Sequence, residues 1–283
     1  MTDTVVPSAP GSAACENCGT ILAGAFCHTC GQSAEPPTRS VRAFAAQAAG
    51  DLTNLDSRLL RTLGTLLGRP GRLTREYLEG RRVRYTQPLQ VYLGAAAAFF
   101  FVNAYRPFLT FDPQKGAVVS SLSAVGISGT MDSESRAGLA ARGISMELFR
   151  ERFEAAATGY LPAFLVGSVL LFGLVLHLFF RRRPGGYIGH AVFSLHWSAF
   201  FLLLMIVERL LPANAGGGPA VEMQDAAIAL AAAGYLCIAL RVVYGDSWLA
   251  TAAKSLGLFL IYQVLLTGWM ASAIAVAFTL LVR

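Results

Sequence analysis

Charged residues are scarce in this sequence. Asp, Glu, Lys and Arg make up only 14% of its 283 residues, whereas a soluble domain averages about 25%. Lysine is rarer still, with only Lys115 and Lys254, so arginine carries almost all of the formal net charge of +6. Because 54% of the residues are hydrophobic, the composition excludes an ordinary soluble domain and predicts several membrane spans. The first forty residues have no apolar core, and we therefore expect no secretory signal peptide.

Motifs of the common enzyme classes are missing as well. The chain has no nucleophile elbow, P-loop, HExxH motif or paired carboxylates. No aromatic-rich basic motif accompanies the arginines, so we expect no nucleic-acid partner. Coupled carriers commonly have acidic residues or lysine in mid-membrane and an internal repeat, and neither is evident here. Arginines that flank apolar runs instead indicate topology signals and contacts with anionic membrane lipids.

Four of the five cysteines lie close together, in the segment CENCGTILAGAFCHTCGQ. Each CxxC pair places two thiolates on one tight turn, and the following glycine lets the backbone curl towards the sulfur atoms. Two such turns complete a closed shell of four thiolates, which is typical of structural zinc in a reducing compartment. A rubredoxin-like iron site and a dithiol redox pair are the alternatives. We predict a zinc ribbon over residues 15–32 with the ligands Cys15, Cys18, Cys27 and Cys30.

The segments on either side of the cysteines are polar or amphipathic. Residues 1–14 form a Pro/Ser/Ala tail without periodicity, which predicts disorder. Apolar residues recur at three- and four-residue steps from Val41 to Leu66, and a shorter amphipathic piece follows at Leu73–Glu79. We therefore predict basic amphipathic juxtamembrane helices over residues 38–87, on the inner membrane surface or under the bundle. A soluble coiled coil or a helical arm is the alternative.

Long apolar runs fill the rest of the chain, residues 88–283, and each is close to the length of about 20 residues that a bilayer core requires. The external segment 106–159 is long enough to hold structure, and its part Ser145–Ala157 predicts an amphipathic helix. The predicted fold class is an all-α multispan membrane protein with a small zinc ribbon. The five predicted transmembrane helices are Pro88–Tyr105, Tyr160–Phe180, Ile188–Leu211, Ala226–Tyr244 and Ser255–Val282.

The distribution of positive charge predicts the orientation of these helices. Residues 1–87 contain ten arginines, Arg181–Arg183 lie between the second and third spans, and Arg241 and Lys254 flank the last link. With the N-terminus inside, all three groups become cytoplasmic, as the positive-inside rule requires. The cysteines then lie in the reducing cytosol and the C-terminus lies outside.

Polar side chains gather at the predicted inner ends of the spans. Tyr187 and His190 share a face of the third span, and the short Arg181–Gly186 link brings the end of the second span beside them. Ionisable groups in a membrane are costly, which makes them candidates for a functional site. Structural hydrogen bonding, a small-molecule or lipid headgroup site, and a metal or haem site are the open interpretations. The predicted polar cluster comprises His177, Tyr187, His190, Arg241, Tyr244 and Asp246, with His196 deeper in the bundle.

Four sequence blocks occur in one order: CxxCG…CxxCGQ, LDSRLLRTL…RPG…REYLEGRRVRY…PL, YxxHxVFxLHxxxF and RVVYGDS. This order resembles a bacterial inner-membrane family with an N-terminal zinc ribbon, catalogued as domain of unknown function 3667. The resemblance runs from Cys15 to about Lys254 and implies the same architecture in a bacterial inner membrane. It draws attention to the block residues Tyr187, His190, His196, Tyr244 and Gly245, and it implies no activity.

Three functions stand as hypotheses. The first is a non-enzymatic membrane adaptor or accessory protein, whose zinc ribbon and basic helices present a cytoplasmic surface to a protein partner. The second is a transporter or binder of small molecules or lipids that uses the His/Tyr/Arg cluster. The third, a membrane enzyme acting through His190, His196 and Asp246, has the least support. Small residues such as Gly94–Ala98 also permit close helix packing between copies of the chain, and hence a homo-oligomer.

Overall fold

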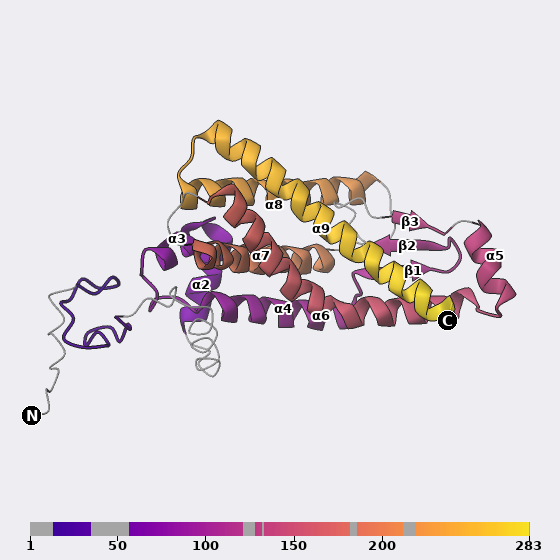
Figure 1. The fold of residues 1–283 in the computed structure, drawn as a ribbon, viewed down its shortest axis with the longest axis horizontal. Coiled ribbons are helices and arrows are strands. Elements are labelled where there is room, and N and C mark those ends of the chain that lie inside the picture. The colour runs from indigo at the N-terminus through magenta and orange to yellow at the C-terminus, as the bar shows by residue number, and fades with distance from the viewer. Residues whose placement is uncertain are drawn as a thin grey trace, which may run out of the picture.

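Helices dominate the structure, a computed structural model that describes residues 14–34, 57–120, 128–131, 133–181, 186–211 and 219–282 (Figure 1). These residues form eight helices and one three-stranded sheet. Residues 1–13 of the predicted tail and residues 38–56 of the predicted juxtamembrane region lie outside the described residues. Five of the described helices are long and apolar enough to cross a membrane, which confirms the predicted multispan helical fold.

The five long helices follow the predicted apolar runs. α4 (Pro88–Tyr105) has the predicted bounds, and α7 (Gly186–Leu210) begins two residues before its predicted start. The other three begin well before their apolar runs, namely α6 (Met146–Phe179), α8 (Pro219–Tyr244) and α9 (Trp248–Val282). A helix as long as α9 extends about 50 Å, whereas a bilayer core measures about 30 Å. α9 crosses α8 obliquely in Figure 1.

α7 is the central helix of the bundle. It packs against α4, α6 and α8, and most of its side chains are buried. The ring centroid of Trp197 lies 6.1 Å from that of Tyr235 in α8 and 6.1 Å from that of Tyr262 in α9. Aromatic side chains therefore join three helices around one buried indole, which fixes the interior of the bundle.

A short helical hairpin closes one end of the bundle. α2 (Ser57–Gly68) and α3 (Arg72–Leu78) meet at a turn where Gly71 has a φ of 77°, a left-handed value that suits glycine. The hydroxyl of Tyr235 donates a hydrogen bond to the carbonyl of Leu66 in α2 at 2.7 Å. The hairpin is thus packed into the bundle, which does not fit a soluble coiled coil. α3 contacts α7 and α8 and buries Leu73, Thr74, Glu76 and Tyr77.

A small sheet lies at the opposite end of the bundle from the hairpin (Figure 1). Its strands are β1 (Leu109–Asp112), β2 (Ala117–Ser120) and β3 (Ser128–Thr130), paired antiparallel in that order, and α5 (Ser133–Ala141) follows them. The sequence did not predict this sheet within the external segment 106–159. Strands of three or four residues are too short to show a reliable alternation of apolar and polar positions.

The amphipathic helix predicted at Ser145–Ala157 is present as the first turns of α6. Ser145 caps it, with its side chain accepting a hydrogen bond from the amide of Leu148 at 3.2 Å. Phe149 and Phe153 are fully buried, and the ring of Phe111 in β1 lies 4.8 Å from that of Phe149. This apolar face therefore forms a second small core beneath the sheet.

Candidate metal centre and the surface beside it

Two matching turns carry the four cysteines. In each turn, the amide of the glycine after the second cysteine donates a hydrogen bond at 2.8 Å, from Gly19 to the carbonyl of Cys15 and from Gly31 to that of Cys27. Both glycines are left-handed, with φ values of 78° and 74°. Only glycine adopts this backbone without strain, so the CxxCG spacing directly produces the turn.

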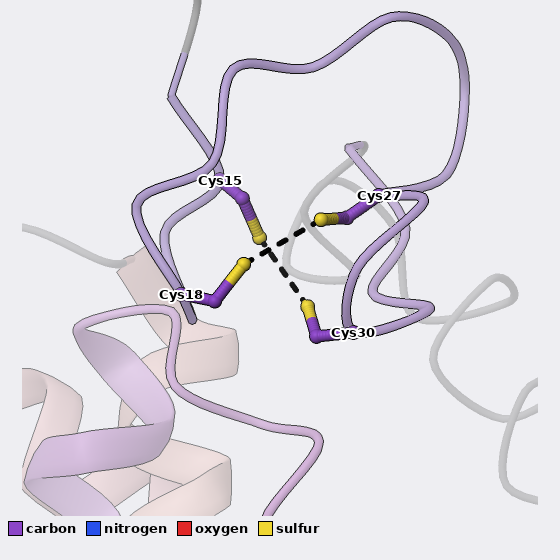
Figure 2. A group of neighbouring side chains, drawn as sticks. All are labelled: Cys15, Cys18, Cys27 and Cys30. Atoms are coloured by element: carbon purple, nitrogen blue, oxygen red, sulfur yellow. Dashed lines mark hydrogen bonds between the residues drawn. The ribbon is translucent and has the colours of Figure 1, made fainter.

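The two turns face each other and bring the four sulfur atoms together (Figure 2). All four lie within 4.8 Å of one another, with 3.6 Å between Cys15 and Cys30 and 3.5 Å between Cys18 and Cys27. A disulfide would need about 2.05 Å. Sulfur atoms placed about 2.3 Å from a tetrahedral zinc lie about 3.8 Å apart, close to the spacing observed here. The four cysteines therefore lie close enough to bind one metal ion.

The thiols of this cluster differ in acidity. Hydrogen bonds with the side chain and backbone of Thr20 lower the pKa of Cys18 to about 6. The amide of Gln32 alone would lower the pKa of Cys30, but burial and the neighbouring thiols of Cys15 and Cys18 raise it to about 11. Four thiolates so close together repel one another, and a bound divalent cation is the natural partner of such a donor set. His28 is exposed and is not among the four grouped ligands.

The cysteine module, residues 14–34, rests on the turn after α3. The side-chain amide of Gln32 donates to the carbonyl of Gly80 at 2.7 Å, and its oxygen accepts from the amide of Arg82 at 3.3 Å. Arg82 also lies 3.5 Å from the carboxylate of Glu16. Gly80 has a φ of 88°, and a side chain there would collide with Glu16. The module is thus held against the hairpin by one buried glutamine and one ion pair.

A groove of about 470 Å³ opens beside this contact. It lies along α3 and reaches the last turns of α8, where Val242 lines it. Gly71, at the start of α3, packs closely against the backbone of Ala239 in the same part of α8. We call it the arginine groove. Its lining residues are Arg69, Pro70, Arg72, Arg75, Glu76, Glu79, Arg81 and Val242.

Glu76 connects the arginine groove to the interior. It is 6% exposed, and its carboxylate accepts hydrogen bonds from Nε of Arg72 at 2.7 Å and from the hydroxyl of Tyr85 at 2.8 Å. Burial alone would raise the pKa of Glu76, but these two hydrogen bonds and the arginine charges hold it below its ordinary value. Glu76 is therefore an ionised, fixed part of the wall.

The predicted polar cluster centres on a pair of residues from α7 and α8. Nδ1 of His190 lies 2.8 Å from the hydroxyl of Tyr244, and both side chains are buried. The ring of His177 lies 5.4 Å from that of His190. Tyr187 lies beside His177, and its hydroxyl donates to the carbonyl of Leu170 at 3.0 Å. Four of the predicted residues thus lie together at the start of α7.

Arg241 and Asp246 take part in a separate set of contacts at the link between α8 and α9. Arg241 donates to the backbone carbonyl of Asp246 and lies over the ring of Trp248. The carboxylate of Asp246 lies 2.6 Å from Nζ of Lys254. Lys254 also lies over the ring of Phe180, which stacks on Tyr244. Phe180 thus links Lys254 to Tyr244, the partner of His190.

His196 lies apart from the cluster, as expected of a residue deeper in α7. Its Nδ1 is 2.9 Å from the hydroxyl of Thr74 in α3, 122 residues away in sequence. Sequence reasoning did not single out Thr74, Glu76 or Gln32. Only Gln32 had a local signal, since it follows the second CxxCG. Thr74 and Glu76 interrupt the apolar face of a short helix, and their partners cannot be read from the sequence.

A model of a known protein family matches part of this sequence. The sequence model described as "Protein of unknown function (DUF3667)" matches residues 56–100. We call residues 56–100 the DUF3667 segment, after the family model that matches them. This match confirms the family resemblance over the second of the four sequence blocks. A search of curated proteins and a search of solved structures found no match.

The DUF3667 segment contains the hairpin and most of α4. All the residues that line the arginine groove belong to it, except Val242. The turn that receives Gln32 also belongs to it, whereas the cysteine module precedes it. The family match therefore coincides with the part of the molecule that joins the cysteine module to the bundle.

Proposed function

We propose that the protein is a membrane adaptor of the bacterial inner membrane, in which a zinc-bound cysteine module presents a binding surface to a protein partner in the cytoplasm. The contact of Gln32 with Gly80 and Arg82 is the observation that carries this proposal. It places the module on the hairpin, so that the module has a fixed position at one end of the bundle. A fixed, exposed module outside the apolar core suits recognition better than chemistry.

The surface of the cysteine module supports a role in binding. Ile21 is 64% exposed and Phe26 is 67% exposed, although the module lies beyond the apolar helices. The four-thiolate site is closed and would leave no open coordination position for a substrate. Zinc would therefore stabilise the fold of the module, and the exposed apolar side chains would contact the partner.

The arginines support a cytoplasmic position for the hairpin end of the bundle. The hairpin end of the bundle has Arg58, Arg61 and the arginines of the groove, and the cysteine module lies at the same end (Figure 1). By the positive-inside rule this end is cytoplasmic, and the last turns of α9 end outside. Alkaline phosphatase fused to the C-terminus should be active, and green fluorescent protein fused there should stay dark. The reverse pattern would contradict the orientation.

Purification of the full chain from its native membrane in mild detergent tests the adaptor function. We expect one protein to be retained in several detergents, and to be lost from the Ile21→Ser/Phe26→Ser double variant. The control is His28→Ala, which changes an exposed residue of the same module and should keep the partner. If no protein is retained reproducibly, or if the control loses it equally, the adaptor proposal is wrong.

The buried imidazoles favour a second candidate, a binder or transporter of a small polar molecule or lipid headgroup. Within the described residues, Nε2 of His190 and Nε2 of His196 are buried without a hydrogen-bond partner. Such atoms are rare in folded proteins and often contact water or a ligand. Flux of a substrate into proteoliposomes that His190→Ala abolishes and His28→Ala leaves unchanged would support this candidate. Equal flux with and without protein would exclude it.

A further inference from the structure

The arginine groove has more positive than negative side chains. Four arginines and two glutamates line it. Glu76 pairs with Arg72, and Glu79 pairs with both Arg75 and Arg81. Within the described part of the chain, the guanidinium of Arg69 has no ion pair and no hydrogen bond. Both carboxylates are therefore already committed, while positive charge remains available to an anion that enters the groove.

The geometry of the ion pairs also leaves hydrogen-bond donors of the arginines available to a ligand. Arg72 contacts Glu76 through Nε, and Arg75 contacts Glu79 through Nε, each at 2.7 Å. A guanidinium has five N–H donors, so the terminal nitrogens of both arginines remain for another acceptor. Planar guanidinium groups match the oxygens of a phosphate better than they match a halide or a single carbonyl oxygen.

The position of the groove relative to the apolar helices indicates where the anion comes from. Val242 in its wall lies two residues before the end of α8 at Tyr244, where that membrane span ends. The close approach of Gly71 to Ala239, one turn earlier, fixes α3 beside this end. The phosphates of a bilayer lie just beyond the apolar core, at the level of such a helix end. The groove therefore opens where headgroups are.

We propose that the arginine groove binds the phosphate of one anionic lipid headgroup. Arg69 and the terminal nitrogens of Arg72 and Arg75 donate to the phosphate oxygens, and the acyl chains lie against the outer surface of α8. Glu76 cannot swing into the groove to compete, because Tyr85 and Arg72 hold it in the wall. This site is independent of the protein partner, since Ile21 and Phe26 do not line it.

Native mass spectrometry of the full chain tests the site, with phosphatidylglycerol and phosphatidylcholine added to the detergent-solubilised protein. We expect one retained phosphatidylglycerol, and at least a tenfold weaker retention in the Arg69→Gln/Arg75→Gln variant. One arginine near an anionic surface changes affinity about fivefold. The matched control, Arg58→Gln/Arg61→Gln, removes the same charge from exposed positions of α2 outside the groove and should keep the bound lipid.

Other results would overturn the proposal. If the groove variant and the control lost phosphatidylglycerol equally, the lipid would be attracted by the overall positive charge and not by the groove. Equal retention of phosphatidylcholine would show that the anionic headgroup is not recognised. Displacement of the lipid by millimolar inorganic phosphate, with phosphate alone protecting the protein against heat, would assign the groove to a soluble phosphate compound.

Arg69→Lys keeps the positive charge but lacks the planar guanidinium group, and we expect this variant to fold and to retain the lipid only in part. Partner capture by the cysteine module is measured separately, so failure of either proposal leaves the other testable.

Discussion

The hydroxyl of Thr74 lies 2.9 Å from Nδ1 of His196, and both side chains are buried. This contact ties α3, which precedes the first membrane span, to the central helix of the bundle. Thr74→Val keeps the shape of the side chain and removes the hydroxyl, so Nδ1 of His196 loses its partner. Because a buried polar group without a partner costs about 1–3 kcal/mol, we expect a clear drop in the thermal unfolding temperature in detergent.

The control for this change is Thr267→Val in α9. The hydroxyl of Thr267 donates to the carbonyl of Gln263 in its own helix at 2.8 Å, and this contact is exposed. Loss of that bond should change stability by a few tenths of a kcal/mol at most. Equal destabilisation by the two substitutions would show that the contact with His196 has no special role.

Gly71 is the second point at which the hairpin depends on close contact. A β-carbon at this position would lie 2.7 Å from the carbonyl oxygen and 2.8 Å from the α-carbon of Ala239, and the φ of 77° is strained for any other residue. Gly71→Ala should therefore destabilise the protein by about 1–3 kcal/mol and separate α3 from α8. Faster proteolysis within the hairpin, compared with wild type at the same temperature, would report that separation.

Gly64 offers the matched control in the same hairpin. It lies inside α2, and a β-carbon there would meet nothing within 4 Å. Gly64→Ala should raise stability by about 0.5–1 kcal/mol, because alanine favours a helix interior. A destabilising Gly64→Ala, or a neutral Gly71→Ala, would contradict the described packing.

The sequence predicted those parts of the fold that depend on neighbouring residues, namely the membrane spans and the cysteine turns. The apolar runs predicted five spans because length and composition alone set whether a helix can cross a bilayer. The CxxCG repeats likewise indicated two turns whose thiols meet. The contacts of Gln32 with Gly80 and of Thr74 with His196 join residues 48 and 122 positions apart, and no periodicity encodes such pairs. Asp246 was expected beside the histidines, but Lys254 competes for its carboxylate from the next helix.

Acidic pH should weaken the hairpin through Glu76. The folded protein holds the pKa of this carboxyl below its ordinary value of 4.5, so the charged form stabilises the fold at pH values above 4.5. That contribution is lost as the pH falls below 4.5 through the lowered pKa. We expect the unfolding temperature of wild type to fall in this range, and that of Glu76→Gln to be lower at pH 7 and to change less on acidification.

Tyr85→Phe provides a second check on the same carboxyl. It removes one of the two hydrogen bonds that stabilise the charged form, and so it should move the acid loss of stability to a higher pH. The measurement is a series of thermal unfolding curves in detergent across this pH range. If Glu76→Gln follows wild type in parallel at every pH, another group causes the acid sensitivity.

Metal binding should be separable from the fold of the bundle. Hydrogen bonds and an ion pair join the cysteine module to the turn at Gly80–Arg82 in the rest of the described chain. We expect one zinc per chain by elemental mass spectrometry, and its loss in Cys15→Ser, since three thiolates hold zinc far more weakly than four. The unfolding temperature of the bundle should stay within a few degrees of wild type.

Cys237→Ser is the control for the loss of a thiol. Cys237 lies in α8, outside the group of four, and its replacement should leave the zinc content unchanged. A chelator should remove the metal from wild type and expose the Gly80–Arg82 turn to proteolysis, because the module unfolds when its four thiolates lose their common cation. Iron in place of zinc would change the assignment of the metal and leave the structural role intact. An unfolded bundle in Cys15→Ser would show instead that the module is part of the core, contrary to the few contacts that join the two.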